Sequence, residues 1–498
     1  MSAFWDNFCL KEKANGFAFT RPDPTSPDHN PNAFYRYHHF LEENGYFGFW
    51  ITLPQAPAEI FLSLVFPRIY ALFLAMRLRP RIVLGQTHNT GSFSVQYLLT
   101  RSPVKILAGF SIFYLFLIQY CRHANYRDPT SYFFDPTRAY DRIYSADRIT
   151  EADAFIRSAE LLPAGPKPAQ KTPVMCVGVA TVTRRGEQYV RRTIGSLLHG
   201  LSEDERDSVY LDILIGHTDP SKHPIFDDKW VKTLPNKVLE YEKTDFARIQ
   251  EWEDGGWYRN KTIFDYTYLL NDCYATGAKY IAMVEDDTLA VEGWYPRALE
   301  ALGDIETKME RRREKWVFLR LFYVEDLFGW NSEYWPTYLI WSFVTWAIAT
   351  SSLLVARNTF RSLQDFLGDA SILVISGVCI PALVALFFAS GRNSIWPLKP
   401  GIHEMNKNGC CSQGYVYPHS IIPDLLERTD LETDWLVDMM VEKISNQEGW
   451  VRWARTPALL QHIGKTSSKG YGFDKTASGL WNFGFELYQK SHLGRSHG

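Results

Sequence analysis

The residues best suited to chemistry are three consecutive carboxylates, Glu285, Asp286 and Asp287, which directly follow the apolar run 280–284. An uninterrupted apolar run is typical of a buried strand. Carboxylates crowded at its end repel one another and therefore favour a bound cation. Mg²⁺ and Mn²⁺ take oxygen ligands from carboxylates and phosphates together, and open α/β sheets bind nucleotides at the carboxyl ends of their strands. The junction predicts a nucleotide-diphosphate site, with a solvated acidic turn as the structural alternative.

A second candidate ligand is His462, which lies far along the chain in the sequence Leu-Gln-His-Ile-Gly. Neutral imidazole binds borderline metals well, and Gly464 would let the backbone come close to a phosphate. A single histidine more often has a structural role than a ligand role. The pattern by itself therefore leaves both interpretations open.

These residues need elements that bring them together, and the hydrophobic pattern predicts strands and helices in alternation. Before residue 330 the predicted elements are strand 174–181, helix 187–198, strand 209–216, helix 260–276, strand 280–284 and strand 316–324. Beyond residue 400 they are strand 413–417, helix 420–428, helix 433–444 and strand 450–455. The alternation indicates an α/β sandwich. The later part is too small for a core of its own, so we expect it to complete the sheet of the earlier part.

Two uncharged apolar stretches, 337–356 and 370–391, separate the two parts of this sheet. Each has about the 20 residues that a helix needs to cross a bilayer. The short link 357–369 implies an antiparallel hairpin, and its Arg357 and Arg361 favour a cytosolic position for the link. A pair of buried core helices is the alternative, but two uncharged runs of this length rarely occur together in a soluble domain.

A third apolar run, 106–121, is short for a membrane span, but a thin early-secretory bilayer would accept it as an N-terminal anchor. The run 60–76 carries Arg68 near its middle. Because a central arginine costs roughly 2.5–3.5 kcal/mol on insertion, we expect this run to be interfacial or cytosolic. No cleavable signal peptide is visible at Met1.

The composition argues against nucleic acid as the main partner, because a net charge of −3 lacks the basic excess that phosphate binding requires. The 7 cysteines fit one or two disulfides in an oxidising compartment. Cys410 and Cys411 are adjacent, and neighbouring cysteines seldom bond to each other. We therefore expect bridges from this pair to Cys176 or Cys273, with metal binding as the lesser alternative.

Several motifs occur together in an order that resembles a known family. The acidic triplet is followed by the two apolar stretches, the pair Cys410 and Cys411, Asp434 in Glu-Thr-Asp-Trp, and finally Leu-Gln-His-Ile-Gly. This order resembles the Golgi enzymes that add N-acetylgalactosamine to glycosylphosphatidylinositol (GPI) anchors after their attachment to protein. The chain is more distantly similar to type IV N-acetylglucosaminyltransferases, which share the triplet and the His-Ile-Gly ending but lack the hairpin. The resemblance covers residues 106–498 and leaves residues 1–100 without a role.

The resemblance implies a GT-A-like glycosyltransferase domain, with a Rossmann-like sheet, that uses a UDP-sugar and Mn²⁺. The residues that it assigns to donor binding are Val182, Thr183, Arg184, Glu285, Asp286, Asp287, His462 and Gly464. The first three of these would line the uridine pocket after the first strand. Glu285, Asp287 and His462 would also hold the metal.

The resemblance also implies a catalytic base. Direct displacement from an α-linked UDP-sugar gives a β product, so one carboxylate base suffices. Asp434 matches the family position and is expected to open the helix 433–444, with Thr433 as its N-cap. Asp438, one turn further on, is the fallback. A first-turn aspartate favoured only by the helix dipole is the structural alternative.

We therefore expect an inverting, metal-dependent enzyme that moves N-acetylgalactosamine from UDP-GalNAc to the first mannose of GPI glycans on GPI-anchored proteins. The alternatives are an N-acetylglucosaminyltransferase acting on N-glycans and a noncatalytic membrane sugar-binding receptor. The expected location is the Golgi membrane, with the catalytic domain in the lumen. The expected segments are a cytosolic or interfacial region 1–103, an anchor 104–121, a lumenal stem 122–170, a first transferase part 171–335, a membrane hairpin 336–392 and a second transferase part 393–498.

Overall fold

The computed structural model describes residues 102–161, 172–407, 409–431, 435–464 and 480–488. Three subjects of the sequence analysis lie outside these residues. They are the region 1–100, which includes the apolar run 60–76, the predicted N-cap Thr433 and the proposed base Asp434. The structure therefore bears on the α/β domain and on the apolar helices.

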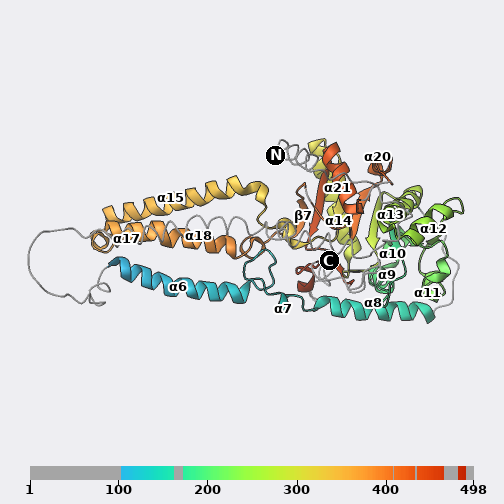
Figure 1. Ribbon diagram of the computed structural model, residues 1–498, viewed down its shortest axis with the longest axis horizontal. Helices are drawn as coiled ribbons and strands as arrows, with labels where there is room; N and C mark the ends of the chain where they lie inside the picture. Colours follow the sequence, from blue (N-terminus) through green and yellow to red (C-terminus); the bar gives the residue numbers. More distant parts are fainter. Residues whose placement is uncertain (1–101, 162–171, 408, 432–434, 465–479, 489–498) are drawn as a thin grey trace, which may run out of the picture. The chain divides into compact units, whose positions relative to one another are not determined.

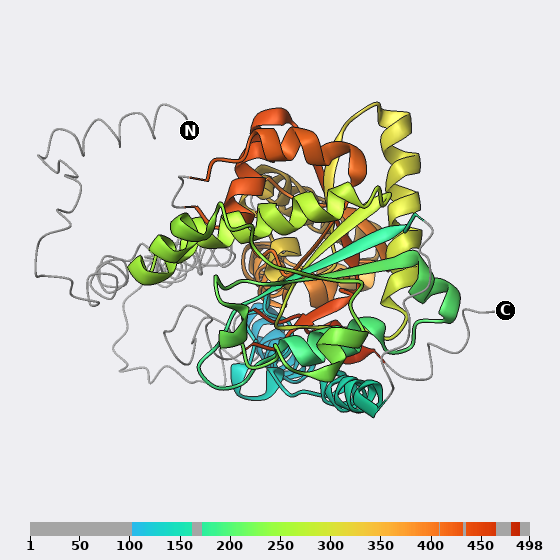
Figure 2. The same cartoon turned by 90° about the vertical axis from the view of Figure 1, so that its right-hand side faces the viewer.

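The described structure is built around an eight-stranded mixed sheet (Figures 1 and 2). Its strands are β1 (Met175–Thr181), β2 (Val209–Ile215), β3 (Lys237–Leu239), β4 (Tyr280–Glu285), β6 (Trp316–Arg320), β7 (Gly401–Glu404), β8 (Gly414–Pro418) and β9 (Val451–Thr456). Their order across the sheet is β3-β2-β1-β4-β8-β6-β9-β7. β8 runs antiparallel to β4 and β6, and β7 to β9, whereas the other neighbouring pairs are parallel. The predicted α/β class is confirmed.

Helices cover both faces of this sheet, because its central strands are apolar on both sides. The longer ones are α8 (Tyr144–Leu161), α9 (Val190–Leu198), α12 (Phe246–Gly255), α13 (Tyr258–Ala275), α14 (Trp294–Arg312) and α21 (Val437–Glu448). Val177 and Val179 of β1 lie in the buried cluster that includes α9 and α14, whereas Cys176 lies in the cluster that includes α13. This alternation is the two-residue period of a strand. Figure 2 shows α14 (yellow) and α13 (yellow-green) on opposite sides of the sheet.

Helix α8 falls in the segment 122–170, for which the sequence predicts a stem. Ala152 and Ile156 of this helix have no exposed surface. Gly195 of α9 lies so close to it that an added Cβ would meet the Ala152 carbonyl oxygen at 2.6 Å. A larger side chain at Gly195 would push the two helices apart. This part of the segment therefore belongs to the α/β core instead of forming a tether.

Most predicted elements form close to their expected ends, but the helix predicted for 433–444 begins later. Helix α21 begins at Val437, because Leu436 keeps an extended backbone with ψ of 158°. The predicted start at residue 433 is therefore wrong, and Asp438 is the acidic residue in the first turn. Helices α12 and α14 and the short strands β3 and β7 have no counterpart in the prediction. The two strands are too short to give a clear period, whereas α14 has apolar residues at helical spacing that the sequence analysis missed.

The chain after the apolar stretches contributes to the same sheet as the chain before them. β8 lies between β4 and β6, and β9 pairs with β6 on the other side. The prediction that the later part completes the sheet is confirmed. Because a hydrogen-bonded sheet cannot continue across a bilayer, both parts must lie in one compartment.

Three apolar segments among the described residues are long enough to cross a membrane. They are α6 (Ser102–Ala124), α15 (Trp335–Thr359) and the stretch Asp369–Ala389, which consists of α17 (Asp369–Val374), a π-helical turn (Ile375–Cys379) and α18 (Ile380–Ala389). Figure 1 shows these helices running side by side. Large apolar side chains cover their outer surface, including Phe116 at 78% and Trp341 at 65% exposure. Such surfaces suggest membrane association.

Short helices connect the main elements. They are α7 (Pro136–Ala139), α10 (Glu203–Ser208), α11 (Lys229–Thr233), α16 (Arg361–Gln364), α19 (Arg392–Ile395) and α20 (Ile422–Glu427). Helix α16 lies in the link of the predicted hairpin. In the same link Arg357 forms an ion pair with Asp369 at 2.6 Å, which ties the end of α15 to the start of α17.

A polar junction joins the end of α6 to the end of α18. Asn125 Nδ2 donates to the Ser390 carbonyl at 2.9 Å, and the Ser394 N–H donates to Asp128 Oδ2 at 2.6 Å. Gly391 between them has a φ of 91°, and a Cβ there would overlap the Asp128 carboxylate. Glycine allows both the positive φ and the close approach to Asp128, because it has no Cβ. The first and the last apolar helices are therefore fixed to each other where they meet the α/β domain.

Two disulfides differ from the predicted pairing. Cys176 of β1 bonds Cys273 of α13, and Cys410 bonds its neighbour Cys411. The predicted bridges from the adjacent pair to Cys176 or Cys273 are therefore wrong. Cys176 and Cys273 face each other between sheet and helix with Cα atoms 5.6 Å apart, a distance that suits a disulfide. Because Cys176 and Cys273 bond to each other, neither is free to bond to the adjacent pair. Cys410 and Cys411 therefore bond to each other.

Candidate active site

A second, two-stranded sheet brings His462 to the acidic triplet. The triplet ends β4, and the chain turns at once into β5 (Thr288–Ala290). β5 pairs antiparallel with β10 (Leu460–His462), and His462 is aligned with Thr288. The Ile463 N–H also donates to the Asp287 carbonyl at 2.8 Å. This ladder places His462 Nε2 3.3 Å from Asp287 Oδ2. The two residues are close in space although the whole apolar insertion separates them along the chain.

The Asp287–His462 pair is buried, with each residue 6% exposed. Burial by itself would raise the pKa of Asp287, but the charge of His462 and its hydrogen bond outweigh that effect, so the pKa lies well below its usual value. Burial likewise disfavours a charged imidazole, but Asp287 raises the pKa of His462 above its ordinary value. The contact therefore favours the charged form of each group, and His462 would have to give up its proton to bind a metal.

Arg184, in the loop after β1, supplies positive charge to the triplet. Its guanidinium pairs with Asp286 Oδ1 and lies 3.2 Å from Asp287 Oδ2. Thr181, the last residue of β1, donates its hydroxyl to Asp286 Oδ2 at 2.6 Å. Both oxygens of Asp286 are thus engaged within the protein. The crowded negative charge that predicted a cation is partly compensated by this arginine.

Glu285 faces the second part of the chain. Ser412 Oγ donates to Glu285 Oε1 at 2.6 Å, and the Glu285 N–H donates to the Gln413 carbonyl at 3.1 Å. Burial, followed by the negative charge of Asp287, raises the pKa of Glu285 to about 7. Glu285 is therefore held in a different environment from the Asp287–His462 pair.

The residues present give a partial fit to a divalent cation. Across the described ranges, no group of three histidine, cysteine or carboxylate side chains converges on one point. Asp287 Oδ1 is nevertheless buried without a hydrogen-bond partner, in the carboxylate whose other oxygen contacts His462. Divalent ions at nucleotide sites often take only one or two protein ligands and complete their shell with phosphate oxygens and water. Asp287 and His462 suit that mode, whereas Glu285 is engaged with Ser412.

The residues predicted to line the uridine pocket lie at the same edge of the sheet. Thr183 donates its backbone N–H to His217 Nε2 at 2.9 Å. Gly216, directly after β2, lies so close to Val182 that an added Cβ would meet Val182 Cγ1 at 2.9 Å. Lys261 of α13 donates to the Gly216 carbonyl at 2.8 Å. The loops after β1 and β2 thus support each other beside Arg184 and the triplet.

The fallback base Asp438 is occupied in a structural role. Its Oδ2 accepts the Cys411 N–H at 2.7 Å, and its Oδ1 accepts the Met439 N–H at 2.8 Å. Gly464 lies close to the site, because a Cβ there would overlap Asp287 Oδ2. The glycine therefore leaves room for the Asp287 carboxylate itself, in addition to any phosphate.

Three residues of this site are absent from the sequence prediction: Thr181, Thr193 and Ser412. Thr193 of α9 donates to the carbonyls of Asp286 and Thr288 at 2.7 and 2.8 Å and so fixes the turn between β4 and β5. Ser412 holds Glu285. Hydroxyl residues are common in every part of a chain, and no spacing marks these as partners of the triplet. Only the position of Thr181 at the end of the first strand gave a usable signal.

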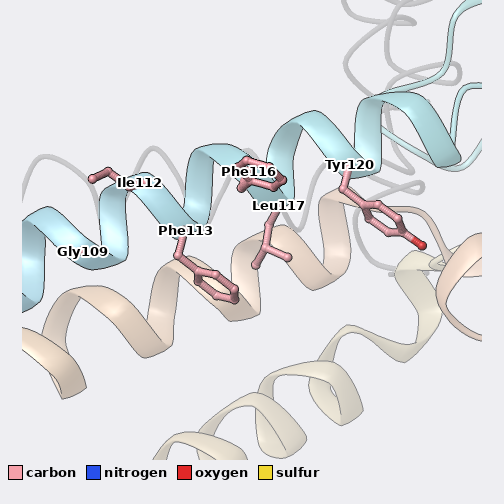
Figure 3. Close-up of a pocket in the computed structure, with 6 residues that line it drawn as sticks. All are labelled: Gly109, Ile112, Phe113, Phe116, Leu117 and Tyr120. Atoms are coloured by element: carbon pink, nitrogen blue, oxygen red, sulfur yellow. The ribbon is translucent and has the colours of Figure 1, made fainter.

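An open apolar depression lies elsewhere, on α6. Figure 3 shows its lining residues, all from this one helix: Gly109, Ile112, Phe113, Phe116, Leu117 and Tyr120. The absence of polar groups that converge there makes it a poor site for a nucleotide or a sugar. An apolar, shallow surface on a membrane-length helix is suited to contact with lipid chains.

A comparison with protein families identifies the family of this chain. The family model described as GPI-N-acetylgalactosamine transferase PGAP4 matches residues 175–461, more than half of the chain. The chain belongs to this family. The PGAP4 match begins at β1 and ends in β10, so it includes both parts of the sheet and the apolar helices between them. A search of curated proteins found no match.

The predicted resemblance to GPI-glycan N-acetylgalactosaminyltransferases is therefore confirmed. PGAP4 membership implies a glycosyltransferase that acts on GPI glycans. It also agrees with the apolar helices, since the acceptor of such an enzyme is anchored in a membrane.

Proposed function

We propose that the chain transfers N-acetylgalactosamine from UDP-GalNAc to the first mannose of GPI glycans, with inversion at the anomeric carbon. The observation that carries this proposal is the β5–β10 ladder, which sets His462, directly after the end of the PGAP4 match, against Asp287 inside the match. A buried carboxylate–imidazole pair at the carboxyl end of a parallel strand is suited to a nucleotide diphosphate. Family membership supports the choice of sugar and acceptor.

In this proposal Asp287 and His462 hold a divalent cation such as Mn²⁺ together with the donor diphosphate, and Glu285 is a further candidate ligand. When bound, the cation would neutralise the leaving diphosphate as a Lewis acid. Because Gly464 has no side chain, the Asp287 carboxylate has room to lie beside the proposed cation. The unpartnered Asp287 Oδ1 is the observation that supports the cation.

Arg184 and Asp286 have a different role in the proposal. Their ion pair, with Thr181, fixes the loop after β1 against the triplet. Val182 and Thr183 in that loop would then line the uridine pocket. A GT-A-like arrangement would put the nucleotide at this edge, because the loops of parallel strands converge there.

The acceptor hydroxyl must lose a proton as it attacks, and we assign this proton to Asp434. The mannose oxygen forms a bond to the anomeric carbon while the bond from that carbon to the UDP oxygen breaks. The proton passes to the Asp434 carboxylate, and UDP leaves with the electron pair of the broken bond. One displacement inverts the configuration and needs no covalent intermediate. Asp438 is less suited, because both of its oxygens accept backbone N–H groups.

We further propose that the enzyme is a multi-pass protein of the Golgi membrane with its α/β domain in the lumen. The support is the length of the apolar helices, the short link between α15 and α17 that contains Arg361, and the shared sheet. A GPI acceptor is held near the bilayer by its lipid. A transferase domain fixed to the same bilayer would meet it at a raised effective concentration.

Substitution of Asp287 tests the site. Purified full-length Asp287→Ala should lose at least about 100-fold in kcat/KM for UDP-GalNAc, because the donor diphosphate loses its main carboxylate contact. Asp304→Ala, on the exposed face of α14, is the matched control and should keep the wild-type rate. Release of UDP and transfer of sugar would be measured with and without Mn²⁺. An undiminished rate in Asp287→Ala would refute the assigned site.

A second measurement separates this function from the N-glycan alternative. Cells that lack the protein should lose the N-acetylgalactosamine side branch of their GPI glycans and keep their N-glycans, as read by mass spectrometry. Re-expression of the wild type should restore the branch. Intact GPI side branches together with altered N-glycans would assign the enzyme to the other reaction.

A further inference from the structure

The turn formed by residues 409–412, hereafter the disulfide turn, carries a bond between sequence neighbours. It lies between β7 and β8, and Cys410 and Cys411 are joined within it. A disulfide stabilises a fold chiefly by closing a loop in the unfolded chain, and this effect is smallest for adjacent residues. The stability of the whole fold therefore does not explain this bond. What it restricts is the conformation of the backbone between the two cysteines.

Buried charged groups bind the backbone of the disulfide turn. Arg320 of β6 has no exposed surface and donates through Nη1 to the carbonyls of both cysteines, at 3.0 Å for Cys411. Glu442 of α21 pairs with this arginine at 2.6 Å. Asp438 accepts the Cys411 N–H at 2.7 Å. Cys411 also has a φ of 84°, a conformation that residues with a side chain rarely adopt. The turn is thus fixed from two elements in an unusual backbone conformation.

The two residues that follow the bond hold the first carboxylate of the triplet. Ser412 Oγ donates to Glu285 Oε1 at 2.6 Å, and the Gln413 carbonyl accepts the Glu285 N–H at 3.1 Å. A change in the backbone at Cys410 and Cys411 can therefore move Glu285 through Ser412 alone. Cys411 is 6% exposed, whereas Cys410 lies at the surface. A small dithiol can therefore approach the bond.

We propose that the Cys410–Cys411 bond is a positioning element of the donor site, which keeps Ser412 on Glu285 and makes donor binding sensitive to reduction. Reduction by a dithiol would break the S–S bond, give each cysteine a hydrogen and leave the dithiol as a disulfide. The freed thiols no longer restrict the peptide between them, so the Ser412 hydroxyl can leave Glu285. This inference rests on the proposed function only where it speaks of donor binding.

The test uses the full-length protein in detergent and the double variant Cys410→Ser/Cys411→Ser. We expect its KM for UDP-GalNAc to rise about tenfold, with a smaller change in kcat and an unchanged melting temperature. Dithiothreitol should raise the KM of the wild type in the same way, reversibly on reoxidation, and should not affect the double variant. A wild-type KM in the double variant, or equal inhibition of both proteins by dithiothreitol, would overturn the proposal.

Two sets of variants exclude a general loss of stability. Cys176→Ala/Cys273→Ala removes the other disulfide, between β1 and α13, and should lower the melting temperature without changing the KM of the folded protein. Ser412→Ala should raise the KM with the bond intact, and Ser412→Thr should restore it. The effects of Ser412→Ala and of the double cysteine variant should not add, because both act on one contact. Additive effects would contradict the proposed route through Ser412.

A function-independent measurement separates this proposal from the assignment of the donor. Hydrogen exchange of the peptide that contains Glu285 should quicken on reduction, because its N–H is bonded to Gln413. If the wild type binds no UDP-sugar but exchange still quickens, the proposed function fails and the positioning role stands. If exchange is unchanged while dithiothreitol demonstrably reduces the bond, the positioning role fails whatever the donor is.

Discussion

At the scale of single residues, the site is an arrangement of charges that the protein largely balances itself. Arg184 lies against Asp286 and Asp287, and His462 lies against Asp287, so a fixed positive charge and a titratable imidazole face two of the three carboxylates. Glu285, the third, has a pKa raised to about 7 by burial and by Asp287. Among the carboxylate oxygens of the described triplet, Asp287 Oδ1 is buried without a hydrogen-bond partner. The proposed cation would lie beside this oxygen.

The glycine beside Asp287 offers a residue-scale prediction. A methyl group at Gly464 would overlap Asp287 Oδ2 and displace the carboxylate, so Gly464→Ala should reduce kcat/KM for the donor by about 100-fold. Gly303→Ala in α14 is the matched control, because nothing lies within 4 Å of its added Cβ. That control should keep full activity and gain up to about 1 kcal/mol of stability. Steady-state kinetics and thermal melts of both variants test this, and equal activity would show that Asp287 tolerates displacement.

At the scale of elements, β2 carries a buried carboxylate that the proposed chemistry does not use. Asp212 has no exposed surface, and both of its oxygens are buried without a hydrogen-bond donor. Burial and the neighbouring Asp272 raise its pKa to about 8. The positive charge of Lys237 in β3 offsets this rise in the pKa of Asp212 only in part, because Lys237 pairs with Asp272 at 2.6 Å. The strand therefore folds most readily with a neutral Asp212.

This carboxylate predicts how stability depends on pH. The unfolded chain loses the Asp212 proton near pH 4 and the folded chain near pH 8, so the folded state binds more protons in between and stability should fall as pH rises through this window. Asp212→Asn cannot ionise and should flatten the fall. At pH 8 it should be more stable than the wild type by ~1 kcal/mol or more, since one pKa unit corresponds to ~1.4 kcal/mol. Melting temperatures from pH 5 to pH 8 test this, and parallel curves for the two proteins would contradict it.

At the scale of the whole molecule, one sheet assembled from both sides of the apolar insertion restricts the topology. β8 hydrogen-bonds to β4 and β6, so the segments before and after the insertion cannot be separated by a bilayer. The polar junction of Asn125 and Asp128 with the end of α18 fixes α6 to the same place. An even number of membrane crossings between the two segments satisfies these contacts, and α15 and α17–α18 are long and apolar enough to supply two.

The topology predicts the outcome of a protection assay. A protease site inserted in α16 should be cut in sealed vesicles, because the proposed orientation places the link in the cytosol. Sites inserted in the exposed helix α10 and after α20 should both be protected until detergent is added. Glycosylation sequons engineered at the latter two positions give an independent readout and should both be modified. Different fates for the sites in α10 and after α20 would refute the two-crossing insertion.

Much of this protein could be predicted from local sequence, because local chemistry determines it. The run 280–284 is apolar enough to be a buried strand, and the triplet after it marks the edge where ligands bind. The apolar helices follow from length and composition alone. The order of these motifs was sufficient to predict the family, which the PGAP4 match confirms. Each single motif or apolar run depends only on residues that are neighbours in the sequence.

Only the tertiary structure decided how distant residues meet. The pairing of β5 with β10 puts His462 against Asp287, and no local pattern encodes the register of two strands of three residues. The bond between Cys410 and Cys411 contradicts the expected pairing, because Cys176 and Cys273 happen to face each other between β1 and α13. Arg184 reaches the triplet only because β1 and β4 are neighbours. Sequence gave the groups for the chemistry, and packing selected their partners, since contacts between distant residues depend on every element that lies between them.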